Sequence, residues 1–582
     1  MFLRIFNFLK VIPILLFFLT FFLVTQMSST HSNSSYSLLS DPFLQFPTTS
    51  SVKVVWFTEF SGIDHKILYG QNLDKVVKAN TTQLSCTRED QDSKVTEDYS
   101  QTTKRNIWRH EGEVTGLNQG EKIPYKVISF VKNQQIESQT FSLSPSPKEK
   151  KPLKTLLTSD HQLKPMVAAN LQKVVETIGK IDAVFFAGDL VNISDCASEW
   201  FDDKRGGAFF PCLQGLANYT IEDTIYRGDQ LIQFAPLFPT IGNHEVMGRW
   251  SQNTGLNRQF VDAIPRNVAK NIYAEKTDII NTNRDPNIES DWIKDNSFNT
   301  DTYEEIFSFP QTESNNSHYY AVTFGDIRLV VLQVTNIWRS PNLSNNVRGR
   351  YQESEKDLEQ PEKWGYGQHI FQTIEKGSEQ YQWLEKELKS QAFKQAKYKI
   401  VMFHHPVHTL GGNIVPPYTD PIQNTTYDSD GNVTEISYHY PKEDDYIIRD
   451  IMPLLETAKV NLVFYGHSHL WNRFLSKDGI NFLESSNVGN SYGAHLGNNK
   501  RPIPPDYSQS NYVEIGNPNG LKAIIPNLAP LTDENNNPLP YIASNYITVF
   551  SILDTEKGIV SSYYFDTRQP NSSVIKFDEF TI

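Results

Sequence analysis

Five stretches of the chain share one pattern, a short run of apolar, β-branched or aromatic residues followed at once by polar ones. The clearest is AVFFAGDLVN, residues 183–192, in which Gly188 stops four apolar residues just before Asp189. The run has no helical spacing, so it predicts a short buried strand that delivers Asp189 into a loop. Open α/β sheets place their chemistry at such strand ends. An isolated Gly-Asp pair is more often a helix-capping carboxylate, so the other four stretches are needed to favour a functional site.

Those four stretches deliver oxygen and nitrogen ligands in the same way. Their polar residues are, in chain order, Asp160, His161 and Gln162; Asn243, His244 and Glu245; His404, His405 and His408; and His467 and His469. Carboxylate, amide oxygen and imidazole together suit zinc, iron or manganese, and none of the five stretches contains cysteine. Two cations about 3.5–4 Å apart need one ligand that reaches both, so the carboxylate of Asp189 is the candidate bridge.

The five stretches resemble the motifs of the calcineurin-like metallophosphoesterases, and the sequence around them resembles the purple acid phosphatase branch. The likeness includes HYYAVTFGDIRLVVLQ (318–333), QYQWLEKELKS (380–390) and PLLETAKVNLVFYGHSH (453–469), and it covers most of the chain from about residue 50. It implies a mixed α+β fold in which two facing sheets are flanked by helices, a four-layer α/β/β/α domain. It also implies two metal ions, of iron, zinc or manganese, with calcium as a further candidate.

The resemblance implies a ligand set for each metal. The first set is Asp160, Asp189 and His469, and the second is Asp189, Asn243, His404 and His467. His404 is preferred to His405 because the family pattern is His-x-Pro and Pro406 fixes the register. His244 is expected to contact the phosphate or to protonate the leaving group. His405 and His408 are candidates for the same catalytic role, although lone histidines are more often surface residues.

Two positions depart from the family pattern. Purple acid phosphatases carry a tyrosine three residues after the Gly-Asp aspartate, where this chain has Asn192. Other metallophosphoesterases carry a histidine two residues after the first aspartate, where this chain has Gln162. Each amide is either a metal ligand through its oxygen or a hydrogen-bond donor to a true ligand. We therefore expect an enzyme without the purple colour.

The resemblance implies hydrolysis of phosphate monoesters by in-line attack of a metal-bound hydroxide. A phosphodiesterase or nucleotidase with the same metals is the closest alternative, because the loops rather than the ligands decide which substrate fits. A non-catalytic binding protein is the alternative from another class, favoured by the missing tyrosine and histidine. The net charge of −13 and the pI near 5.6 argue against a nucleic-acid partner. The oligomeric state stays open.

The N-terminal residues predict export. In residues 1–30, Arg4 and Lys10 precede an uncharged apolar run from residue 11 to 24, which is typical of a signal peptide. No Ala-x-Ala cleavage site follows, so an uncleaved membrane anchor within residues 1–25 is the alternative. Either predicts a protein that is secreted, periplasmic or anchored at the cell surface. Residues 31–50, which begin rich in serine and asparagine, predict a flexible tether.

Residues 51–145 alternate apolar and polar positions at strand period, between turn-forming segments. About seven short strands in roughly 100 residues predict a β-sandwich. This part resembles the fibronectin type III-like domain that precedes the catalytic domain in larger purple acid phosphatases. Nothing marks an exposed aromatic binding face, so we expect it to pack against the catalytic domain, residues 152–582, after a proline-rich linker at 145–152.

Long insertions interrupt the catalytic domain at about residues 194–234, 247–301, 338–372 and 410–446. They follow ligand-bearing strands, so we expect them to ring the metal site and decide which substrate fits. Tyr418, Tyr427 and His439 are candidate substrate contacts, although ordinary loop residues are the commoner case.

Three further features lie outside the motifs. Residues 375–393 predict an amphipathic helix that covers a sheet, and residues 543–567 predict a β-hairpin at an edge of the fold. The chain has three cysteines. In an exported protein a disulfide between Cys196 and Cys212 is a reasonable prediction, which leaves Cys86 unpaired.

Overall fold

The structure is a computed structural model, and it describes residues 36–582 except residue 263 and the segments 311–317, 340–350, 413–416 and 502–519. The predicted signal peptide or anchor, residues 1–30, lies outside the described residues. Within the described part of the chain, no helix has the length and apolar character needed to cross a membrane.

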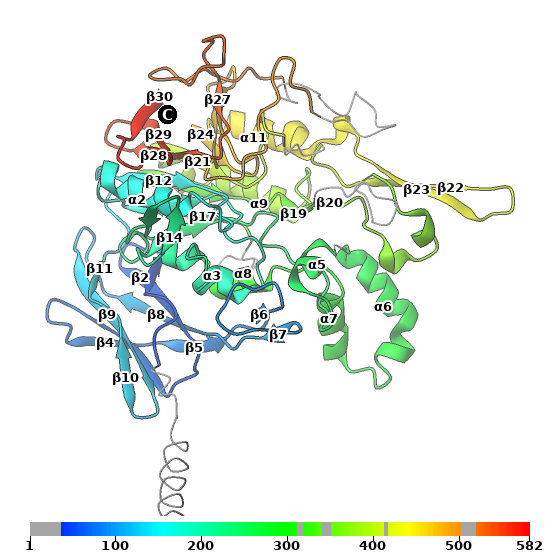
Figure 1. The fold of residues 1–582 in the computed structure, drawn as a ribbon, viewed down its shortest axis with the longest axis horizontal. Helices are drawn as coiled ribbons and strands as arrows, with labels where there is room; N and C mark the ends of the chain where they lie inside the picture. The colour runs from blue at the N-terminus through cyan, green and yellow to red at the C-terminus, as the bar shows by residue number, and fades with distance from the viewer. Residues whose placement is uncertain (1–35, 263, 311–317, 340–350, 413–416, 502–519) are drawn as a thin grey trace, which may run out of the picture. The chain divides into compact units, whose positions relative to one another are not determined.

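A β-sandwich lies at the N-terminal side of the described chain, as predicted (Figure 1). One sheet has the order β1 (Phe43–Gln45), β2 (Ser51–Thr58), β8 (Trp108–Thr115) and β5 (Asn80–Gln83). The other has the order β10 (Gln134–Glu137), β9 (Ile123–Val131), β3 (Asp64–Tyr69) and β4 (Lys75–Lys78), with β11 (Phe141–Leu143) on β9. Its likeness to fibronectin type III domains stays a prediction.

The sandwich begins earlier than the sequence predicted. β1 pairs antiparallel with β2, and its residues Phe43 and Leu44 are buried. The last part of the predicted tether, residues 31–50, therefore includes a core strand. The strand is short and does not stand out in the sequence. Its apolar residues are buried by β2 and by the catalytic domain, and the local sequence does not show these contacts.

The sandwich packs on the catalytic domain through aromatic rings. Phe43 and Phe57 of the sandwich lie 5.1 and 5.4 Å from Phe210 of the first insertion, between ring centroids. The Tyr125 hydroxyl donates to the carbonyl of Gln233 at 2.8 Å. These contacts agree with the predicted packing role, because they bury side chains that a surface-binding domain would leave exposed.

Two sheets form the centre of the catalytic domain. The six-stranded sheet has the order β16 (Leu237–Pro239), β13 (Ala183–Phe186), β12 (Lys154–Thr158), β28 (Ile547–Asp554), β29 (Ile559–Asp566) and β30 (Ile575–Thr581). The seven-stranded sheet has the order β17 (Tyr320–Phe324), β18 (Ile327–Val331), β21 (Tyr398–Met402), β24 (Leu462–Tyr465), β26 (Asn481–Ser485), β25 (Trp471–Leu475) and β27 (Tyr541–Ile542). Both mix parallel and antiparallel pairs, as predicted.

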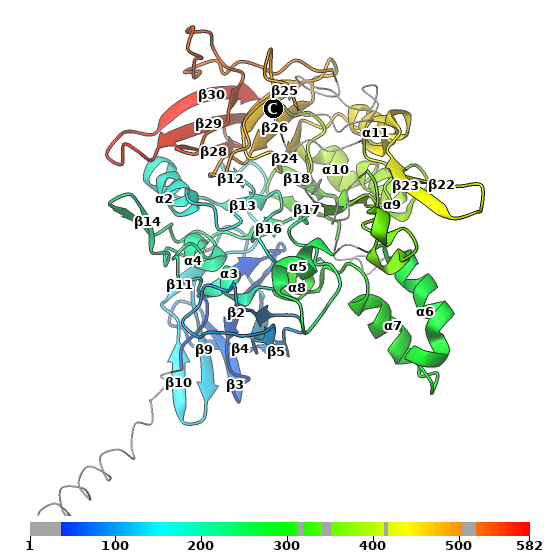
Figure 2. The ribbon, with the colours of Figure 1, turned by 45° about the vertical axis from the view of Figure 1, so that its right-hand side comes forward.

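The two sheets face each other across one apolar core, to which Leu157 and Phe185 contribute from the first sheet and Ile400 and Phe464 from the second. Helix α2 (Val167–Ile178) packs on the other side of the first sheet against β28. Helices α9 (Glu379–Leu388), α10 (Gln391–Gln395) and α11 (Met452–Thr457) cover the second sheet. The predicted four-layer architecture is therefore confirmed (Figure 2).

The predicted amphipathic helix is α9, and it buries Tyr381, Leu384 and Leu388 as expected. Ser378 caps it by accepting a hydrogen bond from the backbone N–H of Tyr381 at 3.2 Å. The predicted C-terminal hairpin is β28 and β29, which extend the first sheet from β12, and β30 forms the edge.

The insertions carry elements of their own. The first holds α3 (Ala197–Phe201), α4 (Phe209–Leu213), β14 (Tyr219–Ile221) and β15 (Thr224–Tyr226). The second holds α5 (Leu256–Val261), α6 (Arg266–Ile280) and α7 (Pro286–Asp295), and α8 (Asp301–Ile306) follows it. The last two hold β19 (Thr335–Trp338), β20 (His369–Phe371), β22 (Ile422–Tyr427) and β23 (Val433–His439), at or next to their predicted bounds.

The predicted disulfide is wrong, because Cys86, Cys196 and Cys212 are all free thiols. The two paired in the prediction pack in separate apolar clusters. Cys212 lies in α4, in the large core that joins the sandwich to the first sheet, whereas Cys196 packs beside Met247 and Phe260. Their spacing in the sequence does not reveal this separation, because the intervening residues fold into two helices.

Candidate metal centre

All five ligand-bearing loops follow the carboxyl ends of strands, as predicted. β12, β13 and β16 are parallel neighbours in the first sheet, and β21 and β24 are parallel neighbours in the second. Parallel strands end at the same edge of a sheet, so their loops come together. The backbone turns sharply there, with positive φ at Asp160 (58°), Asp189 (57°) and His467 (83°). Non-glycine residues seldom adopt such angles, and they concentrate at functional sites.

The glycines of the motifs allow the loops to approach closely. A Cβ on Gly242 would lie 2.2 Å from Oδ1 of Asp189, and a Cβ on Gly188 would lie 2.8 Å from Nδ1 of His404. Neither distance leaves room for a side chain. The glycines of the Gly-Asp and Gly-Asn pairs are therefore needed where two ligand loops and the ring of His404 are in direct contact.

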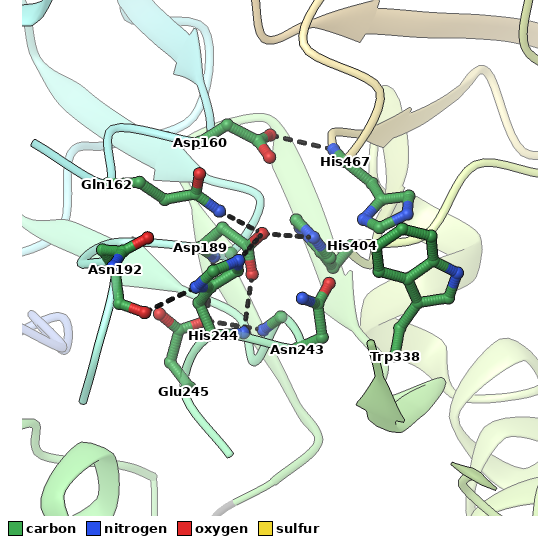
Figure 3. Close-up of polar contacts among 12 residues, drawn as sticks. Asp160, Gln162, Asp189, Asn192, Asn243, His244, Glu245, Trp338, His404 and His467 are labelled. Atoms are coloured by element: carbon green, nitrogen blue, oxygen red, sulfur yellow. Dashed lines mark hydrogen bonds and ion pairs between the residues drawn. The ribbon is translucent and has the colours of Figure 1, made fainter. Parts of the chain in front are cut away.

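The loops bring the predicted ligands into two overlapping groups. The ligand atoms of Asp160, Asp189 and His404 lie within 4.8 Å of one another, and so do those of His404, His405 and His467. His404 belongs to both groups, and its Nε2 lies 3.1 Å from Oδ2 of Asp189. Figure 3 shows Asp189 at the centre, with Asp160 and Gln162 on one side and His404 and Asn243 on the other. Nε2 of His469 lies 3.3 Å from Oδ1 of Asp160.

Three histidines at the site present the same ring nitrogen. Nδ1 of His404 faces the carbonyl of Ala187 at 2.7 Å, and Nδ1 of His469 faces the carbonyl of Asn490 at 3.0 Å. Nδ1 of His244 faces the carbonyl of Asn192 at 2.6 Å. A carbonyl only accepts, so each Nδ1 carries the proton and Nε2 is the nitrogen turned toward the carboxylates. Metal-binding histidines commonly have this arrangement.

Several buried atoms at the site have no hydrogen-bond partner in the described structure: Oε1 of Gln162, Oδ1 of Asn243 and Nε2 of His405. Native proteins rarely leave buried polar atoms unpaired, and a bound ion can satisfy those that no protein group reaches. Carboxylate, amide oxygen and imidazole in one small buried volume fit a hard or borderline cation such as Mn, Zn or Fe. The residues therefore fit a dinuclear metal centre.

The charges of the site shift its pKa values strongly. Burial alone would raise the pKa of Asp189, but the charge of His404, with a smaller contribution from His244, holds it well below its usual value. Burial would lower the pKa of His404, yet the carboxylates of Asp189 and Asp160 raise it to about 10. Burial lowers the pKa of His244 to about 4, despite the opposing charge of Asp189. The site is thus a buried well of negative potential, which attracts a cation.

Gln162 and Asn192 contact the site in different ways. Nε2 of Gln162 donates to Oδ2 of Asp189 at 2.5 Å, so the amide is a hydrogen-bond donor to the central carboxylate in this structure. Asn192 meets the site through its main-chain carbonyl, which accepts from His244. The contact of Gln162 agrees with the second of the two roles that the sequence left open, that of a hydrogen-bond donor to a ligand. The role of the Asn192 side-chain amide stays a prediction.

His405 and His408 have different surroundings, although both were predicted to be catalytic. His405 is buried beside His467, with 3.9 Å between ring centroids, and its Nδ1 lies 2.7 Å from the Thr335 hydroxyl. The ring of His408 instead packs 4.6 Å from that of Phe482. The prediction for His408 is therefore corrected: the chain turns after His405, and His408 points into the apolar core of the second sheet.

Buried glutamates hold the ligand loops by their backbone, and only Glu245 belongs to a recognised motif. Glu245 accepts from the N–H groups of Asp189 (2.8 Å), Leu190 (2.7 Å) and Gly242 (2.7 Å). Glu199 of α3 accepts from the N–H groups of Asn192 and Ile193. Glu484 of β26 accepts from the N–H of Ser468 at 2.6 Å, between the two histidines of the last motif. The motifs do not include the last two, because Glu199 lies in the first insertion and Glu484 lies 16 residues beyond the loop it binds.

Aromatic rings supplied outside the motifs lie against the histidines of the site. Trp338 packs edge-on to His467 at 4.7 Å between centroids, and Tyr492 stacks on His469 at 5.0 Å. Trp338 opens the third insertion, and it is the residue of this group that Figure 3 draws. The third insertion therefore reaches the site, as predicted.

A cavity of about 690 Å³ lies between the second, third and fourth insertions. Phe371 lines it, and the Phe371 ring is 6.5 Å from that of His405. Of the three candidate contacts in the fourth insertion, Tyr418 is buried and its hydroxyl donates to Pro406 at 3.1 Å. Tyr427 is 60% exposed on the β22–β23 hairpin, and His439 ends that hairpin. The insertions thus shape a cavity beside the site, but these three residues do not converge on the ligands.

A family model for calcineurin-like phosphoesterases matches residues 153–470, more than half of the chain. The chain belongs to the calcineurin-like phosphoesterase family. The matched residues begin just before β12 and end just after His469, so they include every ligand loop of this phosphoesterase. Members of the family are metal-dependent phosphoesterases, and the clustered aspartates and histidines could hold the metal.

One solved structure shows the same fold, and two others are similar at lower scores. A purple acid phosphatase from yellow lupin (Lupinus luteus) seeds matches with a TM-score of 0.50 and 14% identity, over 93% of this chain and 73% of that one. A dimetal phosphatase from Danio rerio matches with a TM-score of 0.32 and 11% identity, over 74% of this chain and 99% of that one. GAP50, the anchor in the inner membrane complex of Plasmodium, matches with a TM-score of 0.30 and 11% identity, over 74% and 89%. No curated protein matches the phosphoesterase in sequence.

Proposed function

We propose that this phosphoesterase is an exported, two-metal phosphatase that hydrolyses phosphate monoesters. The observation that carries the proposal is the convergence of Asp160, Asp189, His404, His405 and His467 in two groups that share His404. Two adjacent cations need one ligand that reaches both. The carboxylate of Asp189, 3.1 Å from Nε2 of His404, has the two oxygens for this, whereas His404 offers only Nε2. Export rests on the signal-like pattern of the first 30 residues.

The metals would be held by the residues that the structure brings together. Asp160, Asp189 and His469 would hold one cation, and Asp189, Asn243, His404 and His467 would hold the other. Cations bound there would neutralise charge on the phosphate oxygens. They would also lower the pKa of water, so that hydroxide is available to attack phosphorus near neutral pH.

His244 is the residue placed to handle a proton. The Asn192 carbonyl binds its Nδ1, so Nε2 faces the site, 3.9 Å from Oδ2 of Asp189. A phosphate held over Asp189 would lie within reach of that nitrogen. Once Nε2 has taken up a proton, His244 can therefore donate to a phosphate oxygen or supply the proton that the leaving oxygen needs.

Glu245 and Glu199 support this arrangement through the backbone. They bind the N–H groups of Asp189 and of Asn192, the residue that orients His244. The loop that carries both the central carboxylate and the carbonyl partner of His244 is thus fixed at two points. Such rigid support keeps reacting groups in place when the substrate binds.

The test is hydrolysis of p-nitrophenyl phosphate and of bis(p-nitrophenyl) phosphate by residues 31–582, with added Mn²⁺, Zn²⁺, Fe²⁺ or Ca²⁺. Asp189→Asn is the control, because it keeps the shape of the side chain and removes its charge. We expect metal-dependent release of p-nitrophenol from the monoester, and its loss in Asp189→Asn.

The possible outcomes separate the alternatives. Faster hydrolysis of the bis-ester would favour a phosphodiesterase on the same metals. A purified protein that binds no metal and hydrolyses neither ester would favour the non-catalytic alternative. Equal rates in the wild type and in Asp189→Asn would contradict the assignment of Asp189. Detection of the intact full-length protein only in the cytoplasm of its host would contradict export.

A further inference from the structure

Among the site histidines that the structure describes, only His244 has its ring against a residue of the second insertion. That residue is itself in contact with an arginine. The ring of Phe260, at the end of α5, stacks on His244 with 4.9 Å between centroids and 27° between planes. The guanidinium of Arg339 lies 3.5 Å from the centre of the same Phe260 ring. Phe260 and Arg339 are 7% and 4% exposed, so this stack is a buried part of the site.

Arg339 binds the main chain on both sides of His244. Its Nη1 donates to the carbonyl of Asn243 at 2.9 Å, and its Nη2 donates to the carbonyl of Val246 at 2.8 Å. Its Nε donates to the carbonyl of Phe260 at 2.9 Å. One guanidinium therefore links the loop that carries His244 to the end of α5 by hydrogen bonds. The planar guanidinium of arginine allows this geometry, whereas the ammonium group of lysine does not.

The other side of the His244 ring is fixed independently. Its Nδ1 donates to Asn192, and its backbone N–H donates to Oδ1 of Asp189 at 2.9 Å. The carbonyl of Asn192 sets the rotation of the ring, and Phe260 sets its plane. Together they aim Nε2 at the space beside Asp189 (Figure 3).

We propose that Phe260 and Arg339 are positioning residues that act through His244, so that the second insertion affects the rate of phosphate release without touching the substrate. The proposal rests on the proposed phosphatase activity and on the role of His244 in it. Neither residue belongs to a ligand motif. Phe260 comes from the second predicted insertion and Arg339 from the third.

The experiment is a double-mutant cycle with p-nitrophenyl phosphate. Phe260→Leu keeps an apolar side chain but removes the flat ring, and Phe260→Tyr keeps the ring. Each is measured alone and together with His244→Ala. Tyr273→Leu is the matched control, because it removes a buried aromatic ring from α6 of the same insertion, away from the ligands.

We expect Phe260→Leu to lower kcat about tenfold while KM changes less than twofold, because the phosphate is still bound but the imidazole is misaimed. Phe260→Tyr and Tyr273→Leu should stay within about twofold of the wild type. In the His244→Ala background, Phe260→Leu should cause no further loss. Metal content, measured by inductively coupled plasma mass spectrometry, should be equal in all variants.

An equal loss from Phe260→Leu in the presence and in the absence of His244 would overturn the proposal, as would a kcat unchanged by Phe260→Leu. If Phe260→Leu folds poorly, Arg339→Lys supplies the second test, and it too must lose its effect when His244 is absent. Inactivity of the wild type with every metal would refute the proposed phosphatase instead, so the two failures are distinguishable.

Discussion

In the part of the chain that the structure describes, buried histidines cluster in the sandwich and at the metal centre. His65 and His110 stack in the sandwich with 3.7 Å between ring centroids. His405 and His467 lie almost as close at the metal centre, with 3.9 Å between centroids. Burial and spacing are therefore alike in the two clusters. What differs is the set of atoms that the ring nitrogens meet.

In the sandwich every ring nitrogen has an oxygen partner within 2.9 Å, and none of these partners is a carboxylate. The partners of His65 and His110 are Ser129, Ser61, Thr58 and Thr81. The Ser61 carbonyl must accept from His65, and the Thr58 hydroxyl already donates to the carbonyl of Phe60, so it accepts from His110. Each ring thus donates one hydrogen bond. The hydroxyl of Ser129 can donate to the other nitrogen of His65, and that of Thr81 to the other nitrogen of His110. The network is complete with both imidazoles neutral.

At the metal centre the pairing is incomplete. Nδ1 of His404 is satisfied by a carbonyl, but its Nε2 is turned to Asp189, and Oδ1 of Asn243 has no hydrogen-bond partner. A buried polar cluster in which every group has a hydrogen-bond partner stabilises the fold. A cluster that leaves oxygen and nitrogen lone pairs without a partner can instead bind a cation. The comparison teaches that the partners of a buried histidine, rather than its burial, indicate its role.

The largest expected effect comes from changing one histidine in each cluster. His404→Ala should remove metal and lower kcat/KM about 1,000-fold or more, because it takes away a ligand that lies 3.1 Å from the central carboxylate of Asp189. His110→Gln should leave metal content and activity within about twofold, since nothing at the site contacts it. Metal analysis and p-nitrophenyl phosphate hydrolysis measure both. Loss of metal from His110→Gln, or full activity in His404→Ala, would contradict the distinction.

The ligand loops could be predicted from the sequence because each is a local signal. An apolar run and the polar residues that follow it lie within about ten positions, and the structure places Asp160, Asp189 and His404 together as those runs predicted. The four layers were implied by the family resemblance rather than by the runs themselves, and the two sheets with their covering helices confirm them.

The supports of the site could not be predicted, because they depend on contacts between distant segments. Glu484 lies 16 residues from the loop it binds, and Arg339 lies 96 residues from Asn243. Neither stands in a pattern that distinguishes it from an ordinary charged residue. The wrong placement of His408 has the same origin, because a turn after a strand decides which histidine faces the ligands and which faces the core.

A fall in pH should destabilise the sandwich through His110. Burial, with smaller contributions from the neighbouring His65 and Arg109, lowers the pKa of His110 from 6.5 to about 2, while Asp64 faces His65. The unfolded chain therefore takes up a proton below about pH 6.5 that the folded sandwich refuses, so stability falls by about 1.4 kcal/mol per pH unit until the folded pKa is reached.

Urea unfolding at pH 7 and at pH 4.5 measures this effect. The wild type should lose about 2–3 kcal/mol more than His110→Gln between these two pH values, because only the wild type gains the proton of His110 on unfolding. Carboxylates elsewhere contribute equally to both proteins and cancel. Parallel losses in the two proteins would show that His110 is protonated in the folded sandwich.

A smaller effect should follow from the amide beside the central carboxylate. Gln162→Met keeps the length of the side chain and removes the hydrogen bond to Asp189. We expect metal affinity to fall about tenfold, as for other hydrogen-bond partners of metal ligands. Competition with a chelator measures the affinity. A loss of more than about 1,000-fold would identify Gln162 as a ligand in its own right, the other role that the sequence allowed.

The smallest effect on activity is expected at His408, and its neighbour His405 supplies the matched comparison. Each is changed to glutamine, which is similar in size and polar. His408→Gln should lower stability by about 1–2 kcal/mol, since its ring packs between Phe474 and Phe482, but should leave kcat/KM within about threefold. His405→Gln should lower kcat/KM far more, because its ring lies among the ligands. Equal losses of activity at constant stability would return His408 to the site and weaken the rule that a histidine's partners reveal its role.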